Sequence, residues 1–137
     1  MPNESRRRLN DEILQIAVTR LSPQPQWAVI VTVDGDIMAT YSIYSPDDIL
    51  HTEEERKSAM SAAALSLGER VSAEMGHRTL RECIIYGTDG TFIMLVMNDD
   101  LVLSTNFAAI PSLDDTLSQL RDTVEGINKL LNALGGF

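Results

Sequence analysis

Residues 80–107, LRECIIYGTDGTFIMLVMNDDLVLSTNF, decide the fold, because three apolar runs there are separated by two polar turns. The first turn carries Asp89-Gly90, a pair that favours a tight hairpin because both residues tolerate positive φ. The second turn is Asn98-Asp99-Asp100. Each run has the length and the β-branched and aromatic content of a strand. The stretch therefore predicts a three-stranded antiparallel meander.

The middle run, residues 92–97, is apolar at every position. A strand with one wet face would alternate between apolar and polar residues, so this strand needs cover on both faces. Hydrophobic periodicity and capping residues predict that cover as helices at residues 5–21, 52–75 and 112–134. A β-hairpin is predicted at residues 27–43, around the turn Asp34-Gly35-Asp36. The element order is thus α-β-β-α-β-β-β-α.

The order of strands in the sheet follows from their polarity. Residues 27–33 are too apolar for an edge, whereas residues 37–43 are acceptable there. Placing residues 101–107 beside residues 27–33 gives the order 2-1-5-4-3 and leaves residues 81–86 as the other edge. We predict one α+β domain over residues 1–137, with three α/β/α layers. The second helix covers one face of the five-stranded, mainly antiparallel sheet, and the first and third helices cover the other.

The second helix carries two stripes that compete for the sheet. The apolar stripe is predicted to face the sheet and comprises Met60, Ala63, Ala64, Leu67, Val71 and Met75. The neighbouring stripe is mostly small and comprises Ser58, Ala62, Leu65, Glu69 and Ser72. Small side chains allow a second helix to approach closely, although Ala and Ser also simply tolerate helix. Both interpretations of this stripe stay open. A capping box from Thr52 to Glu55 is predicted to start the helix.

The outer helices carry one apolar stripe each. In the first helix this stripe comprises Leu9, Ile13, Ile16, Ala17 and Leu21. In the third it comprises Leu113, Leu117, Leu120, Val124, Ile127, Leu131 and Leu134. Both are predicted to pack on the sheet, since an amphipathic helix beside an uncovered sheet contributes to the core.

Composition excludes several classes of function. The 137 residues suffice for one core, and the net charge of −9 disfavours nucleic acid or an anionic membrane as partner. The basic cluster Arg6-Arg7-Arg8 is interpreted as a solvated helix start. No apolar run reaches the ~20 residues of a membrane span, and no apolar signal region follows the amino terminus. The single cysteine, Cys83, fits a reducing compartment, so a cytoplasmic protein is expected.

No catalytic, cofactor or metal site is predicted. His51 and His77 flank opposite ends of the second helix, too far apart to share a metal. The stretch Gly87-Thr88-Asp89-Gly90 lacks the Gly-Lys-Ser/Thr ending of a phosphate loop. Residues 98–100 lack the remaining ligands of a calcium loop. Cys83 has no signature of a nucleophile and is interpreted as a small buried residue.

The element order, the hairpin at residues 34–36, the small-residue helix ending at Gly76 and the meander together resemble the Roadblock/dynein light chain family. They are similar in particular to bacterial MglB-type proteins, which regulate small Ras-like GTPases. The resemblance covers nearly the whole chain and implies a homodimer in which the third strands of two subunits pair edge to edge. It also implies that the two second helices then form a platform for a GTPase.

Carried onto this sequence, the resemblance assigns two sets of residues. The expected dimer interface comprises Ser58, Ala62, Leu65, Glu69, Ser72, Arg81, Cys83 and Ile85. The expected GTPase contacts on the second helix are Arg56, Ser61, Leu65 and Arg70. Two other classes stay open: a structural adaptor without a GTPase, and a small-molecule sensor with a PAS-like or profilin-like sheet. Three helices covering two faces argue against the sensor, which needs an open sheet face.

Overall fold

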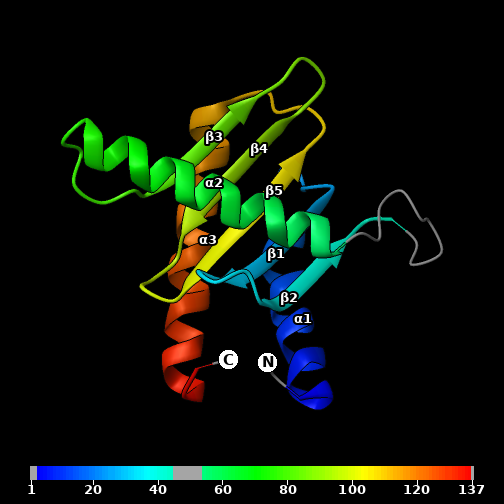
Figure 1. Cartoon of the computed structure of the whole chain (residues 1–137). Helices are drawn as coiled ribbons and strands as arrows, with labels where there is room; N and C mark the ends of the chain where they lie inside the picture. The colour runs from blue at the N-terminus through cyan, green and yellow to red at the C-terminus, as the bar shows by residue number, and fades with distance from the viewer. Residues whose placement is uncertain (1–2, 45–53, 137) are drawn as a thin grey trace.

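Three helices and five strands make up the chain in the computed structural model, which describes residues 3–44 and 54–136. They are α1 (Glu4–Thr19), β1 (Trp27–Thr32), β2 (Ile37–Ser42), α2 (Glu54–Glu74), β3 (Glu82–Tyr86), β4 (Thr91–Val96), β5 (Leu101–Phe107) and α3 (Leu113–Leu134). The strands form one antiparallel sheet in the order β2-β1-β5-β4-β3 (Figure 1). The predicted element order and strand order are confirmed. The expected cap at Thr52, together with His51, lies outside the described residues.

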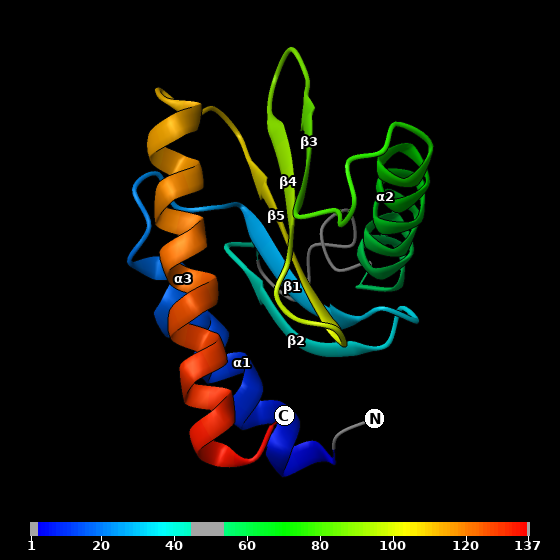
Figure 2. The same cartoon turned by 90° about the vertical axis from the view of Figure 1, so that its left-hand side faces the viewer.

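The sheet separates two apolar layers. Helices α1 and α3 lie on one face and α2 on the other (Figure 2). The strands alternate between these faces: Ala28 and Ile30 of β1 join the α1/α3 layer, while Val29 and Val31 join the α2 layer. The α1/α3 layer is the larger cluster of buried side chains, and burial of each large one stabilises the fold by about 1.5–3 kcal/mol. The three predicted layers are therefore present.

Helix α1 is rotated relative to the prediction. Its buried residues are Asn10, Leu14 and Val18, whereas Leu9 and Ile16 of the predicted stripe are 40% and 56% exposed. The rotation follows from the position of α1 beside the edge strand β2, where a polar residue can be buried if the backbone satisfies it. Asn10 Nδ2 donates to the Met38 carbonyl at 3.0 Å.

Helix α3 packs on the sheet with most of its predicted stripe, although Leu134 at its end is 45% exposed. Leu117, Leu120, Ile127 and Leu131 are buried against the sheet. The Ser112 hydroxyl accepts the Asp115 N–H at 3.2 Å and begins the helix. Gly135 ends it with φ +81°, a left-handed conformation that suits glycine.

The β3–β4 turn differs from the prediction. Neither Asp89 nor Gly90 takes a positive φ, and the Gly87 N–H donates to the Gly90 carbonyl at 2.8 Å. Glycine is needed for another reason, since a Cβ at Gly90 would lie 2.7 Å from the Phe107 carbonyl oxygen. The close approach of β5 therefore determines this position, and the left-handed turn inferred from the sequence is wrong.

Candidate protein-interaction site

Helix α2 presents its large apolar side chains to solvent. Met60, Leu67, Val71 and Met75 are 45%, 64%, 46% and 66% exposed. The residues that it buries instead are Lys57, Ser58, Ser61, Ala64, Leu65 and Ser72. The predicted orientation of α2 is therefore wrong: apart from Ala64, the apolar stripe faces outward.

Several small residues of α2 lie against the rest of this chain. The Ser58 hydroxyl donates to the Gly35 carbonyl in the β1–β2 turn, and the Ser61 hydroxyl donates within the helix to the Lys57 carbonyl at 2.8 Å. A Cβ at Gly68 would lie 2.6 Å from Leu80 Cδ2, so the glycine lets Leu80 pack against the helix. At Ser58 and Gly68 the small side chain therefore allows close approach of the β1–β2 turn and of Leu80 within this chain.

Lys57 shows how a charged residue fits on the buried side of α2. Its ammonium nitrogen lies 5.0 Å from the centre of the Trp27 ring, a cation–π distance. Burial lowers the pKa of Lys57, while the nearby Glu54 carboxylate raises it. The aliphatic stem of Lys57 can cover apolar surface of the sheet. It adds apolar contact to the layer between α2 and the sheet, which is the smaller of the two clusters of buried side chains.

The exposed edge of the sheet is β3, and it is apolar. Within the residues that the structure describes it pairs only with β4, and Ile84, Ile85 and Tyr86 are 38%, 57% and 74% exposed. An edge strand with large apolar side chains and free backbone groups is a template for pairing with another strand. The carboxyl-terminal turns of α2 reach beyond this edge (Figure 1).

The opposite edge, β2, is covered by α1. The Asp11 carboxylate accepts the Thr40 N–H at 2.8 Å, next to the bond from Asn10 to Met38. Arg7 adds hydrogen bonds of 3.3 and 3.4 Å to Thr40 Oγ1 and to Glu54 of α2. Side chains of α1 therefore occupy outward backbone groups of β2, and they leave β3 as the open edge.

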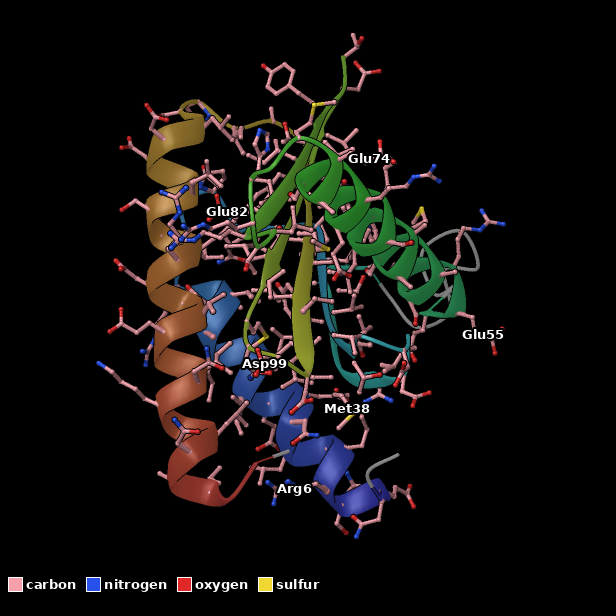
Figure 3. All side chains as sticks on the ribbon, turned by 60° about the vertical axis from the view of Figure 1, so that its left-hand side comes forward. Arg6, Met38, Glu55, Glu74, Glu82 and Asp99 are labelled. Carbon is pink, nitrogen blue, oxygen red and sulfur yellow. The ribbon has the colours of Figure 1, made fainter. Side chains whose placement is uncertain are left out.

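A second set of contacts ties β3 to α3. The Glu82 carboxylate accepts two hydrogen bonds from the Arg121 guanidinium, at 2.6 and 2.7 Å, and Figure 3 shows Glu82 directed toward α3. These bonds lower the pKa of Glu82 and raise that of Arg121. Cys83 points to the α2 layer, where burial raises the pKa of its thiol.

The residues expected at the dimer interface fall into two groups. Ser58, Leu65 and Ser72 are buried within this chain, so the structure contradicts their assignment to an intermolecular surface. Ala62 and Cys83 are half-buried, and Glu69, Arg81 and Ile85 are exposed.

The expected GTPase contacts divide in the same way. Ser61 is fully buried and Leu65 nearly so, which removes both from any docking surface. Arg56 and Arg70 are exposed, and Arg70 Nε lies 3.3 Å from the Glu74 carboxylate. The outward apolar stripe of α2 replaces Ser61 and Leu65 as a candidate contact.

We call Met60, Leu67, Val71, Met75, Ile84, Ile85 and Tyr86 the α2/β3 surface. Within residues 3–44 and 54–136, no group of three or more His, Cys, Asp or Glu side chains could hold a metal ion. The same residues include no helix that is long and apolar enough to cross a membrane. The α2/β3 surface is suited to binding another protein, because it combines exposed apolar side chains on α2 with an open apolar sheet edge, and exposed apolar patches and open edges both mark such sites.

Comparison with known proteins agrees with this fold. The family model described as the Roadblock/LC7 domain matches residues 15–107. The chain belongs to the Roadblock/LC7 family. None of the curated proteins matches the sequence closely.

Solved structures give the same fold at low sequence identity. MglB of Myxococcus xanthus superposes with a TM-score of 0.71 at 11% identity, covering 97% of this chain and 99% of that one. A Roadblock/LC7 domain from Streptomyces avermitilis gives 0.74 at 14% identity, covering 88% and 96%. The gliding protein MglB of Thermus thermophilus gives 0.72 at 11% identity, covering 91% and 90%. Family and fold together support a regulatory or adaptor role.

Sequence reasoning missed Asn10, Asp11 and the Glu82–Arg121 pair. Asn10 and Asp11 carried a weak signal, since they interrupt the apolar positions of α1, but their partners are backbone groups of β2. Glu82 and Arg121 are 39 positions apart in the sequence, and only the packed helix brings them together.

Proposed function

We propose that this chain is a homodimeric regulator that binds a small Ras-like GTPase through the α2/β3 surface. The observation that carries the proposal is the open apolar edge β3 lying beside an outward apolar stripe on α2. A two-fold pair would satisfy the free backbone groups of β3 and bring two α2 helices together. The Roadblock resemblance supplies the GTPase as the partner.

The dimer is tested by the size of the molecule in solution. The Arg81 carbonyl and the Gly87 N–H flank β3 and bond on the side of β4. By the alternation of an antiparallel ladder, the Ile85 N–H therefore faces β4 and the Ile84 N–H faces outward. Ile84→Pro removes this free donor from the edge and should reduce strand pairing between subunits.

Ser42→Pro is the matched control. The Ile43 N–H donates to the Gln26 carbonyl, so the Ser42 N–H faces outward from β2, the edge that α1 covers. Multi-angle light scattering at micromolar concentration should show that Ile84→Pro loses this contact and that Ser42→Pro keeps it. A wild-type protein that is entirely monomeric would refute the dimer.

The GTPase is tested by binding. Small GTPases from the same cell, in both nucleotide states, should bind the wild type and prefer one state. Leu67→Arg places a charge on the exposed stripe of α2 and should weaken binding at least about tenfold, because it desolvates an unpaired charge in the contact. Ala133→Arg, exposed on α3, is the control. Equal binding by Leu67→Arg, with the dimer intact, would exclude α2 as the platform.

The mechanism of regulation can be separated in the same assay. Ordering of the GTPase's own switch loops is the mechanism we propose, since small contact energies decide their arrangement. The competing mechanism is an arginine finger from Arg56 or Arg70, whose loss costs ~10³-fold or more in hydrolysis rate. A smaller effect of Arg56→Ala and Arg70→Ala on single-turnover GTP hydrolysis would support ordering. Binding of other proteins without any GTPase would favour the adaptor alternative.

A further inference from the structure

A second apolar surface lies on the other side of the sheet, between α1 and α3. A groove of about 380 Å³, open to solvent, runs between the two helices. Its lining comprises Ile13, Ile16, Ala17, Arg20, Asp122, Thr123, Gly126, Ile127 and Leu130. This groove belongs to neither the α2/β3 surface nor the proposed GTPase platform.

The groove is held at both ends by hydrogen bonds. At one end the Gln119 side chain accepts the Ser22 N–H and donates to the Ser22 carbonyl, both at 3.0 Å. At the other end Arg6 donates to the Gly136 carbonyl, near the chain's carboxyl terminus (Figure 3). The helices are thus fixed relative to each other, and the hollow between them is a formed feature of the fold.

Gly126 is placed where a second helix could approach. Glycine inside a helix costs about 0.5–1 kcal/mol relative to alanine. A Cβ at Gly126 would meet nothing within 4 Å, so packing within the chain does not require this glycine. Ala17 lines the same groove from α1. Two small residues facing one groove permit close approach of another helix backbone.

The rim of the groove is apolar, with one charge on each wall. Ile16 of α1 is 56% exposed, and Leu130 of α3 is 42% exposed. Arg20 stands on the α1 wall and Asp122 on the α3 wall. Neither forms an ion pair with the other or with any residue in the part of the chain that the structure describes.

We propose that this groove is a second self-association surface, occupied by α1 and α3 of another copy of this chain. A two-fold axis along the groove places Arg20 of each copy opposite Asp122 of the other, so both unpaired charges are satisfied by one operation. Ile16 and Leu130 then enter the partner's hollow, and Gly126 allows the helices to approach. Together with pairing through β3, this contact produces a dimer of dimers.

The test combines substitutions at the two surfaces and measures the size of the assembly by sedimentation. The salt concentration is about 0.15 M, because repulsion between copies of this acidic chain is then screened beyond ~8 Å. Ile84→Pro alone should leave a dimer that assembles through the groove. Adding Arg20→Glu or Asp122→Arg should weaken that dimer at least about tenfold, because two ion pairs become like-charge contacts. The double exchange Arg20→Asp with Asp122→Arg should restore it. Arg70→Glu, exposed on α2, is the control for charge alone.

The outcomes separate this proposal from the proposed function. A folded Ile84→Pro variant that is monomeric at 100 µM, in a range where a Kd of about 10 µM would be detected, overturns the groove contact. Single charge variants without effect, or a folded double exchange without recovery, also overturn it, as does an occupant other than this chain. Should Ile84→Pro not fold, Arg20→Glu in the wild type decides: it should reduce the tetramer to a dimer. Reduction to a monomer would keep the groove contact and refute the β3 pairing.

Discussion

Glu82 links the open edge of the sheet to α3. Its carboxylate is directed away from the free side of β3 and receives two hydrogen bonds from Arg121, at 2.6 and 2.7 Å. This ion pair therefore holds the edge strand against α3, while Ile84, Ile85 and Tyr86 of the same strand stay exposed. Such anchoring reduces the conformational freedom that pairing with a second strand would otherwise remove.

Replacing Glu82 with Gln should lower the thermal midpoint at pH 7, because it removes the charge that Arg121 pairs with. Since Arg121 lowers the pKa of Glu82 in the folded chain, the pair stabilises the fold above the ordinary carboxyl pKa of about 4.3. That stabilisation is lost as the pH falls through the lowered pKa. The difference between wild type and variant, measured by thermal unfolding, should shrink below about pH 4. Glu125→Gln, at an exposed helical ion pair with Lys129, should change little. A constant difference across this range would contradict the assignment.

Gly90 is fixed by the neighbouring strand and not by its φ. Gly90→Ala should destabilise the fold by about 1–3 kcal/mol, because the new Cβ meets the Phe107 carbonyl. Gly126→Ala, at an open helical position, should instead stabilise the isolated chain by about 0.5–1 kcal/mol. Urea unfolding at a low protein concentration, where the groove is unoccupied, measures both. Equal and small effects would show that β5 can move away from the turn.

Among the elements, α2 tests whether an apolar stripe identifies the buried face of a helix. Leu65→Ala should cost about 2–5 kcal/mol, because Leu65 is 6% exposed and packs on the sheet. Leu67→Ala, two positions away and 64% exposed, should stay within about 0.5 kcal/mol. Denaturant unfolding of the two variants gives the comparison directly. A larger loss for Leu67 would restore the orientation that the sequence predicts.

The sheet was predictable because its signals are local. The apolar run 92–97 requires cover on both faces, and its flanking turns set the meander. The helices α1 and α2 were oriented wrongly because periodicity assigns the most apolar stripe to the core. In this chain Leu9, Ile16 and Leu67 belong to outward stripes, while Asn10 and Ser61 are buried. Periodicity locates the stripes but cannot decide which one the sheet receives, since buried polar residues depend on partners distant in sequence.

The same limit applies to the candidate site. Residues 81–86 were predictable as an exposed edge from their place in the strand order, because the polarity of the other strands assigns the remaining positions. The cover of β2 was not, because Asp11 and Thr40 are 29 positions apart and meet only when α1 docks. Sequence reasoning therefore located the open edge and missed the side chains that close the other one.

For the whole molecule, the two sheet edges determine how assembly stops. Pairing through β3 alone is isologous and closes after two copies. If β2 were also open, β3 of one copy could pair with β2 of the next, and such head-to-tail contacts do not close. Asn10 and Asp11 occupy the Met38 carbonyl and the Thr40 N–H. They therefore act against open-ended growth, as covered edges do in other sheet proteins.

Asn10→Ala with Asp11→Ala should convert discrete oligomers into larger assemblies that grow with protein concentration, because it frees backbone groups along β2. The double change should also cost stability, about 1–3 kcal/mol for each buried group left without a partner. Sedimentation velocity across a concentration series measures the growth, and circular dichroism shows whether the variant stays folded. Glu12→Ala, exposed on the same helix, should keep the wild-type distribution. Adding Ile84→Pro should abolish the growth, since head-to-tail pairing needs both edges. Growth that persists in this triple variant would mean that partial unfolding, and not edge pairing, drives the assembly.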